Sequence, residues 1–412
     1  MLEQMPDSPK KRPFEKELEF HDQRWAKKET DRGFLSRKTK EDFMREEALL
    51  DDEDFEKKFK RESKEEYDAW ETHAKPVREA FLEQSRNPEG VDFVTVAAFL
   101  PGGMRAAGIA GAALALNEMG IKVNYAVGSS SGDTVATRLV GGREQLLRGI
   151  AMLTGPLADK KFIDVLRPGN TIDINYIKEL EDHGEYALDQ EAIKNSHSKL
   201  WTIVTEPMNG NEEPRVKILD KKTIKPGIST GSVATMSIPA VTGDIPEIDG
   251  VKYYDGGFAV FPVREIIEKV KAENPGKKVK MLIFTQASFE ALEDIKPAPL
   301  EITAGKIMRG VAGPLQGMGS LGTAATVRQL AKGLVLKENL RKTLQAIEEE
   351  TGADIGVEWA PVSSLSMTSI DGNEMKMASD QSFREIIKRF GMQQPDEIPT
   401  YVPKKDEFRQ AA

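Results

Sequence analysis

The 412-residue chain contains no cysteine, and this absence removes several kinds of protein from consideration. Disulfide-stapled domains, thiolate catalysis, zinc fingers and iron–sulfur clusters all require thiols. Histidine is nearly as scarce, and the four residues are His21, His73, His183 and His197. No two of them form an HxH or HxxxH pair, so neighbouring imidazoles do not share a metal-ligand spacing. We therefore expect neither a metal site nor a cofactor.

An excess of positive charge is also missing. The chain has 58 Lys and Arg against 67 Asp and Glu, a formal net charge of -9. Because nucleic-acid binding depends on a basic surface that displaces counterions, this balance argues against a nucleic-acid partner. The first residues also lack the apolar segment of about 7–15 residues that a secretory signal needs. We therefore expect a cytoplasmic location.

A long membrane-spanning run is absent too. One weakly charged segment, residues 94–116, contains Pro101-Gly102-Gly103 and much alanine. A turn of this kind interrupts a spanning helix, so the segment is interpreted as a strand, a tight loop and a helix.

Charge is concentrated in residues 1–90, which hold 20 Lys and Arg and 25 Asp and Glu. Apolar residues recur there only at mixed spacings, which predicts a charged, mostly helical N-terminal extension. Surface helices packed on the body are one interpretation, and an arm that binds a protein partner or self-associates is the other. Asn87-Pro88-Glu89-Gly90 is rich in turn formers and marks the expected boundary. Residues 91–292 would then form the core, and residues 293–412 the C-terminal part of the same body, with a cap segment or a surface connection over 293–324 and a long helix over 325–350.

Beyond the extension, β-branched apolar runs alternate with helical segments. The expected strands cover residues 91–100, 122–127, 200–205 and 280–285, the expected helices residues 105–119 and 133–140, and a hairpin residues 245–254. The order strand, helix, strand, helix requires parallel strands joined by crossover helices. The sequence therefore predicts an α/β fold with a mainly parallel central sheet.

The second predicted strand runs into Gly128-Ser129-Ser130-Ser131-Gly132. A strand, Gly-x-Ser-x-Gly and a helix form the pattern of a nucleophile elbow, in which the serine stands on a strained turn. The residues two before and two after that serine approach each other, which favours glycine at both positions. Only Ser130 has glycine on both sides, so it is the candidate nucleophile; a Gly/Ser turn without function is the alternative.

A serine nucleophile needs a proton acceptor. His183 and His197 stand in the polar settings Glu-Asp-His-Gly and Asn-Ser-His-Ser, which are typical of loops. Asp255, in contrast, ends an apolar strand and precedes Gly256-Gly257. This places a carboxylate on a tight turn with little bulk around it, although an ordinary Asp-Gly turn would have the same sequence.

A third motif, Pro101-Gly102-Gly103-Met104-Arg105, joins the first predicted strand to its helix. A Gly-rich loop at this place presents backbone N–H groups at a helix N-terminus, which suits an anion or a developing oxyanion. The loop is neither GxGxxG nor GxxxxGK[ST], so neither a dinucleotide site nor a P-loop is indicated.

The Gly-rich loop, the elbow and Asp-Gly-Gly follow one another in the order found in the patatin-like phospholipases, and the chain resembles that family over roughly residues 92–290. Ser237-Ile238-Pro239 is similar to the serine–proline segment that leads to Asp-Gly-Gly in that family. The resemblance implies a three-layer patatin-like α/β sandwich and a Ser–Asp dyad without histidine, with Ser130 as nucleophile and Asp255 as base.

By the same resemblance, the oxyanion hole would consist of Gly102, Gly103, Met104 and Ser131, with Arg105 bracing the loop or binding an anion and with Gly128 and Gly132 shaping the elbow. The sequence departs from the family pattern at Pro101, Ala106 and Asp133, where glycine, glycine and a small apolar residue are usual.

The resemblance implies a lipid acyl hydrolase, similar to phospholipase A or lysophospholipase, that cleaves carboxylic esters through a Ser130 acyl-enzyme. The partner would be a lipid or another acyl ester, with transient contact to a membrane surface and no cofactor. Two alternatives remain. A catalytically weak or inactive binding protein on the same body would explain the altered loop and Asp133, and a soluble carboxylesterase or acyl-transferase would use the same dyad on another acyl donor.

Overall fold

The computed structural model describes residues 53–164, 167, 170–206, 215–238, 241–243, 245–258, 261–285, 337–360 and 369–402. The chain divides into two compact units. One unit comprises residues 1–63 and 296–304, and its described part is the beginning of helix α3 (Glu53–Arg86). The other comprises residues 64–295 and 305–412 and contains the sheet and the candidate site.

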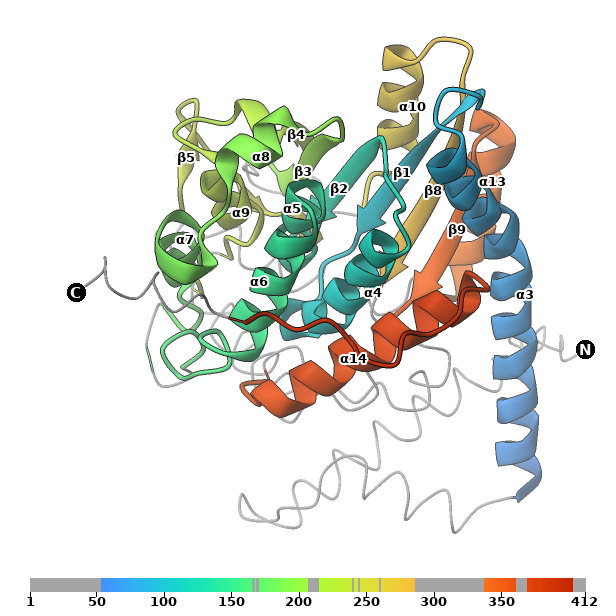
Figure 1. Cartoon of the computed structure of the whole chain (residues 1–412), viewed down its shortest axis with the longest axis horizontal. Coiled ribbons are helices and arrows are strands. Elements are labelled where there is room, and N and C mark those ends of the chain that lie inside the picture. Colours follow the sequence, from blue (N-terminus) through green and yellow to red (C-terminus); the bar gives the residue numbers. More distant parts are fainter. Residues whose placement is uncertain are drawn as a thin grey trace, which may run out of the picture. The chain divides into compact units, whose positions relative to one another are not determined.

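The larger unit is built on a seven-stranded sheet (Figure 1). Its parallel strands, in spatial order, are β3 (Lys199–Thr205), β2 (Tyr125–Ser129), β1 (Phe93–Phe99), β8 (Lys278–Thr285) and β9 (Asp354–Trp359). Two further strands, β4 (Val216–Asp220) and β7 (Tyr254–Asp255), pair antiparallel to β3. The mainly parallel sheet confirms the predicted α/β class and each of the four predicted strands.

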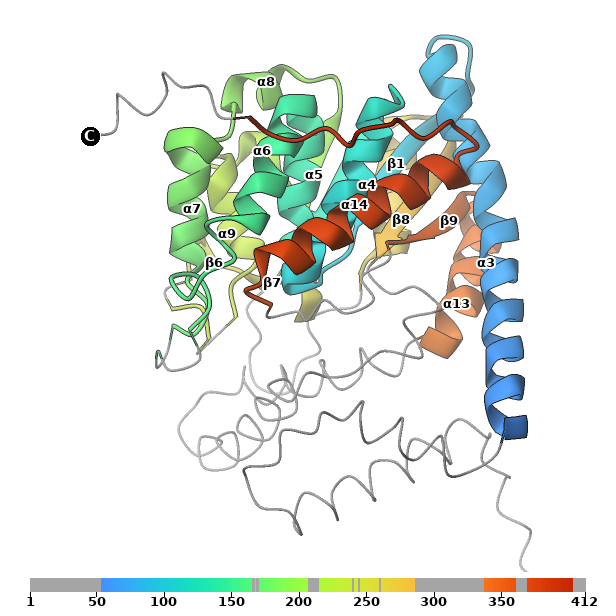
Figure 2. The ribbon, with the colours of Figure 1, turned by 60° about the horizontal axis from the view of Figure 1, so that its bottom comes forward.

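Both faces of the sheet are buried, which explains why β1 is apolar apart from Thr95 instead of alternating with polar residues. Ala97 and Phe99 point into one core, and Val94, Val96 and Ala98 point into the other. Helices supply the rest of each core (Figure 2). The first core includes residues of α4 (Ala106–Glu118), α5 (Ser131–Gly141), α6 (Arg143–Thr154), α7 (Ile174–Asp182) and α14 (Gly372–Arg389) among its helices, and the second includes residues of α10 (Val263–Glu273) and α13 (Lys337–Thr351).

Short elements complete the described fold. They are the 3-10 turns η1 (Gly103–Arg105), η2 (Gly184–Tyr186), η3 (Lys221–Thr223) and η4 (Gly256–Phe258), and the helices α8 (Gln190–Asn195) and α9 (Ile228–Thr235). The predicted hairpin is present as β5 (Glu247–Ile248) and β6 (Val251–Lys252), which pair antiparallel. Asp249 and Gly250 form its tip with φ of 52° and 78°, the left-handed backbone that an Asp-Gly turn favours.

Helix α3 packs firmly on the sheet unit from residue 64 onward. Val77 and Phe81 are buried in the first core and Trp70 in the second. Arg78 donates to the fully buried Glu358 of β9 at 2.6 Å. The expected turn at the end of the extension is present, with Gly90 N–H donating to the Asn87 carbonyl, but the two units divide between residues 63 and 64. The part of the extension beyond residue 63 therefore matches the interpretation of helices packed on the body.

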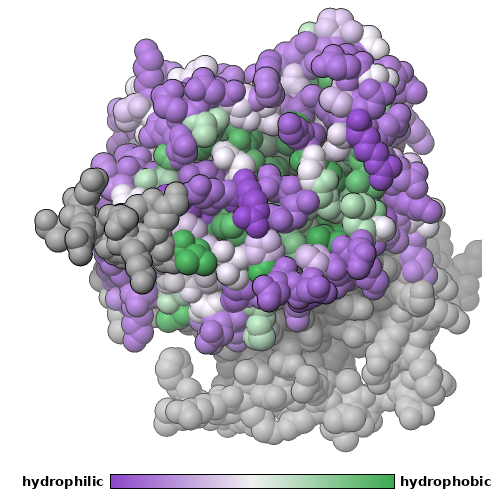
Figure 3. All heavy atoms as spheres, in the orientation of Figure 1, coloured by the Kyte–Doolittle hydropathy of each residue, from purple (hydrophilic) through white to green (hydrophobic). Residues whose placement is uncertain are grey.

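Several expectations fall outside the described residues: the extension before residue 53, the cap segment 293–324 and the start of the long helix before residue 337. Within the described ranges, none of the helices has the length and apolar content needed to cross a bilayer. The face seen in Figure 3 is mostly hydrophilic, with apolar side chains gathered in small groups between polar ones.

Candidate active site

The turn after β2 has the strained geometry that a nucleophile elbow requires. Ser130 has φ of 51° and ψ of -133°, and α5 begins at the next residue. A non-glycine residue held in such a conformation costs roughly 1–3 kcal/mol, so the surrounding packing must enforce it. A Cβ on Gly128 would lie 2.3 Å from the Asp133 Cα, and one on Gly132 would lie 2.4 Å from the Phe99 carbonyl oxygen. Both elbow positions therefore accept glycine alone.

The end of β2 also creates the place where Asp255 binds. Ser129 is the last residue of β2 to pair with β3, opposite Ile203. On β3, Val204 pairs with Lys217 of β4 on one side and with Asp255 of β7 on the other. Strand β7 thus takes the edge that β2 leaves when its chain turns into the elbow. This register brings Asp255 beside Ser130 although 125 residues separate them.

The two side chains form a hydrogen-bonded dyad. Ser130 Oγ donates to Asp255 Oδ2 at 2.8 Å, and both residues are buried. The second carboxylate oxygen, Oδ1, accepts the Gly257 N–H at 2.7 Å. A Cβ on Gly256 would lie 2.2 Å from the Ile203 carbonyl oxygen, so the first glycine of Asp-Gly-Gly allows the strand end to approach β3. Gly257 therefore binds the carboxylate, and Gly256 allows the chain to bring it into place.

Backbone contacts hold each member of the dyad. Ser130 N–H donates to Thr235 Oγ1 at 2.9 Å, and the Thr235 hydroxyl donates to the Ile203 carbonyl. Asp255 N–H donates to the Ser237 carbonyl at 2.8 Å, and its own carbonyl accepts the Thr205 hydroxyl at 2.9 Å. Sequence reasoning missed Thr205 and Thr235. The serine–proline segment gave a signal for Ser237, while Pro239 lies outside the described residues.

Burial raises the pKa of Asp255 from 3.8 to about 6, while the bonds from the Gly257 N–H and the Ser130 hydroxyl lower it. Desolvation is the largest cause, because a carboxylate away from water loses its hydration, and the described residues contribute no cation to the shift. A carboxylate with this pKa is ionised at neutral pH and more basic than one in water. It can therefore accept the proton of the serine that already donates to it.

The Gly-rich loop follows β1 at the same carboxyl edge of the sheet. Gly103 has φ of 57° and opens η1, which continues into α4. The N–H groups of Gly103 and Met104 open this helical turn and that of Ser131 opens α5, so none has a partner within its own helix. Gly102 differs from the expectation, because its N–H donates to Ser131 Oγ at 3.2 Å and ties the loop to the elbow. The N–H groups of Gly103, Met104 and Ser131 therefore stay candidates for oxyanion donors, and Arg105 ends η1.

Histidine has no part in the dyad. Among the residues that the structure describes, the hydrogen-bond partners of Ser130 outside its own turn are Asp255 and Thr235. His183 and His197 are both exposed, whereas Ser130 is buried. Across the described ranges, no group of three or more His, Asp or Glu side chains is arranged to hold a metal ion.

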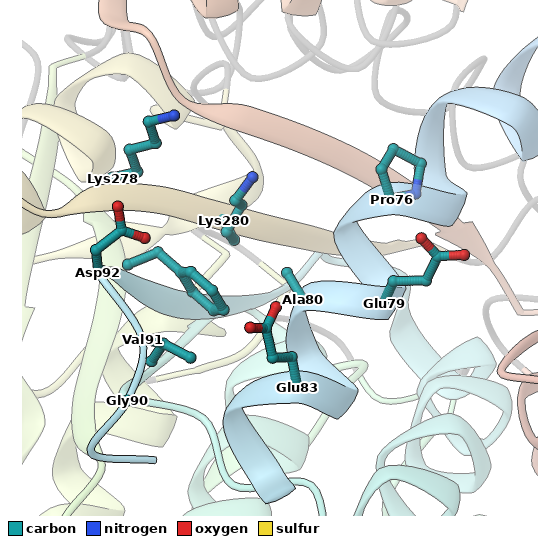
Figure 4. Close-up of a pocket in the computed structure, with 10 residues that line it drawn as sticks. Pro76, Glu79, Ala80, Glu83, Gly90, Val91, Asp92, Lys278 and Lys280 are labelled. Atoms are coloured by element: carbon teal, nitrogen blue, oxygen red, sulfur yellow. The ribbon is translucent and has the colours of Figure 1, made fainter. Parts of the chain in front are cut away.

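A separate hollow of about 370 Å³ lies at the opposite, amino-terminal ends of β1 and β8, against α3 (Figure 4). Its charged lining is mixed, with Glu79, Glu83, Asp92, Lys278 and Lys280, and no residue of the dyad or the Gly-rich loop reaches it. We therefore place the candidate active site at the carboxyl edge alone.

No family model matches the chain, and no curated protein matches it significantly.

Proposed function

We propose that the chain is a serine-dependent carboxylic ester hydrolase of the patatin type, with the three-layer sandwich of that family and a lipid acyl ester as substrate. The observation that carries the proposal is the 2.8 Å hydrogen bond from Ser130 Oγ to the buried Asp255 carboxylate, formed on a strained elbow. The Gly-rich loop, which Gly102 ties to Ser131 of the elbow, supports the same chemistry, because the first N–H groups of η1 have no partner within that turn and could bind an oxyanion.

The reaction begins when Asp255 takes the hydroxyl proton of Ser130 and Ser130 Oγ attacks the ester carbonyl carbon. The carbonyl oxygen becomes an oxyanion, which the N–H groups of Gly103, Met104 and Ser131 stabilise. When the intermediate collapses, the carbon–oxygen bond to the alcohol breaks, and Asp255 returns the proton to the leaving alkoxide. The acyl group remains on Ser130.

Water completes the cycle by the reverse sequence. Asp255 removes a proton from a water molecule, which attacks the acyl carbon, and the second oxyanion uses the same N–H donors. Its collapse releases the fatty acid, and the proton passes from Asp255 to Ser130 Oγ. Both halves therefore need one base whose pKa lies close to the working pH.

The alternative of an inactive binding protein rested partly on Asp133, a carboxylate beside the expected oxyanion. In the structure Asp133 forms an ion pair with the buried Lys221, so its charge is compensated. This pairing favours the enzyme over the binding protein. A soluble carboxylesterase or acyl-transferase would use the same dyad, and the choice of acyl donor distinguishes these activities.

The proposal is tested by exposing the wild type to a fluorophosphonate probe and to p-nitrophenyl esters of increasing chain length. We expect covalent labelling at Ser130, located by peptide mass spectrometry, and a preference for long acyl chains. Ser130→Ala should lose both labelling and hydrolysis, typically by about 10⁴–10⁶ in rate. Ser129→Ala is the matched control, because Ser129 is a buried neighbour outside the dyad, and it should keep both. An unlabelled wild type would refute the proposal, and preference for short esters would refute the lipid substrate.

A further inference from the structure

A fully buried lysine joins the helix that follows the elbow to a second helix. Lys221, in η3 between β4 and α9, donates from Nζ to Asp133 Oδ2, to Thr137 Oγ1 at 2.6 Å and to Ser232 Oγ at 2.6 Å. An ammonium group has three protons, and these three acceptors satisfy all of them. Asp133 and Thr137 belong to α5 and Ser232 to α9, so one side chain joins two helices.

Each of these helices is connected to the dyad. Helix α5 begins directly after Ser130, and Asp133 stands in its first turn. Helix α9 contains Thr235, which accepts the Ser130 N–H, and leads to Ser237, whose carbonyl accepts the Asp255 N–H. Because α9 contacts both members of the dyad, the position of α5 relative to α9 controls the distance from Ser130 Oγ to Asp255.

The packing around the lysine is tight, so a shift of α5 relative to α9 would also move the elbow. The Asp133 backbone lies so close to Gly128 that a Cβ there would approach its Cα to 2.3 Å, so the first turn of α5 cannot shift without moving the elbow. On the other side, a Cβ on Gly231 would lie 3.1 Å from Lys221 Cγ, which shows that the lysine stem packs directly on the α9 backbone.

Stability alone does not explain this arrangement. Burying an ion pair costs desolvation, and apolar residues of similar volume often serve the fold equally well. Two further buried charged residues, Glu181 of α7 and Arg138 of α5, lie close enough for their charges to act on one another, and the charge of Lys221 acts on Glu181. With Asp133 and Lys221 they form two acidic and two basic groups, so the cluster balances in charge when both acids are ionised.

We infer that Lys221 is a positioning residue for the Ser130–Asp255 dyad, which it aligns by holding α5 against α9 through Asp133, Thr137 and Ser232. This inference rests on the proposed esterase function. Lys221 touches neither Ser130 nor Asp255 and takes no part in proton transfer. Its loss should therefore change the rate of the chemical step and leave substrate binding nearly unchanged.

The test compares the full-length wild type with Lys221→Met, which keeps the apolar stem and removes the ammonium. We expect the rate of fluorophosphonate labelling at Ser130 and kcat for ester hydrolysis to fall by about 10²-fold, the cost of displacing a reacting group by about 1 Å. KM should stay within about threefold. Lys222→Met is the matched control, because it makes the same substitution in the same 3-10 turn, where Nζ bonds to the Ser196 carbonyl at 2.7 Å and not to the cluster. It should label at the wild-type rate.

A second variant separates positioning from stability. Lys221→Met/Asp133→Asn removes both charges, so it avoids an unpaired buried carboxylate and should unfold at a higher temperature than Lys221→Met. The bridge remains broken, and its labelling should stay slow. Ser232→Ala, which removes one acceptor and no charge, should slow labelling severalfold in a folded protein.

Recovery of the labelling rate together with thermal stability in the double variant would overturn the inference, as would wild-type labelling of folded Lys221→Met or Ser232→Ala. Those outcomes leave the esterase proposal intact. A wild type that neither labels at Ser130 nor hydrolyses esters would instead overturn the esterase proposal, and the role of Lys221 with it.

Discussion

Two buried aspartates lie close to the elbow, and their surroundings differ. Asp255, at the end of β7, accepts one hydroxyl and one backbone N–H, and its pKa is raised to about 6 because burial removes water and the described residues contribute no cation to the shift. Asp133, in the first turn of α5, is paired with the ammonium of Lys221. Two buried aspartates can therefore have different roles, since Asp255 is the proposed base and Asp133 is one half of an ion pair. Charge compensation distinguishes them.

The largest effect is expected from Asp255→Asn on turnover. Asparagine keeps the shape of the side chain and loses its basicity, so Ser130 has no proton acceptor and ester hydrolysis should slow by roughly 10³-fold or more, by analogy with the loss of one member of a catalytic unit. The measurement is kcat/KM on a long-chain ester. Near wild-type turnover would reduce Asp-Gly-Gly to an ordinary turn.

Asp133→Asn should lower the free energy of unfolding. It leaves the fully buried Lys221 without its counter-ion, and breaking a buried pair in this way costs about 3–5 kcal/mol. Chemical denaturation at pH 8 measures the free energy of unfolding. A loss below 1 kcal/mol would show that the Lys221 ammonium does not depend on this partner.

The same substitution at Asp255 should raise the free energy of unfolding, where Asp133→Asn lowers it. Because the pKa of Asp255 is higher in the folded protein than in the unfolded chain, ionisation above pH 6 costs folding free energy, and this cost disappears as the pH falls toward 4. A rise from 3.8 to about 6 corresponds to about 3 kcal/mol, which is an upper value for the gain. Asp255→Asn should therefore be more stable than the wild type at pH 8 and lose that advantage near pH 4. A constant difference across this range would contradict the assignment.

The pH profile of ester hydrolysis by the wild type should show the titration of Asp255. Hydrolysis should fall on the acid side with a midpoint near pH 6, as Asp255 becomes protonated and can no longer accept the Ser130 proton. The profile of kcat/KM between pH 4 and 8 measures this midpoint in the free enzyme. A rate that is flat down to pH 4.5 would mean that another group is the base.

The smallest effect is expected from the double variant His183→Gln/His197→Gln. Both side chains are exposed and neither is a hydrogen-bond partner of the dyad, so turnover should stay within a few-fold of the wild type. A collapse of activity at an unchanged melting temperature would return a histidine to the mechanism.

Local signals in the sequence were sufficient to predict four strands of the sheet and both members of the dyad. The apolar runs predict β1, β2, β3 and β8, and Gly-x-Ser-x-Gly picks Ser130 from three adjacent serines because close approach of the chain excludes every other residue at Gly128 and Gly132. Strand β9 escaped prediction, although it pairs along its whole length with β8. Its short segment, Asp354–Trp359, is only partly apolar and includes the buried Glu358, whose charge is compensated by Arg78 and Arg389.

By itself, then, the sequence determined where the chain turns and which residue types those turns admit, since these depend on sterics over a few neighbouring positions. The tertiary structure alone decided how the distant parts meet. On β3, β2 pairs as far as Ile203 and β7 pairs from the next residue, Val204. This places the end of β7 beside Ser130. Lys221, in a sequence Asp-Lys-Lys-Thr that is typical of an exposed turn, is buried because α5 and α9 close over it and supply three acceptors. Burial and charge compensation arise from contacts between residues far apart in the chain, and they distinguish Asp255, whose pKa burial raises, from the ion-paired Asp133.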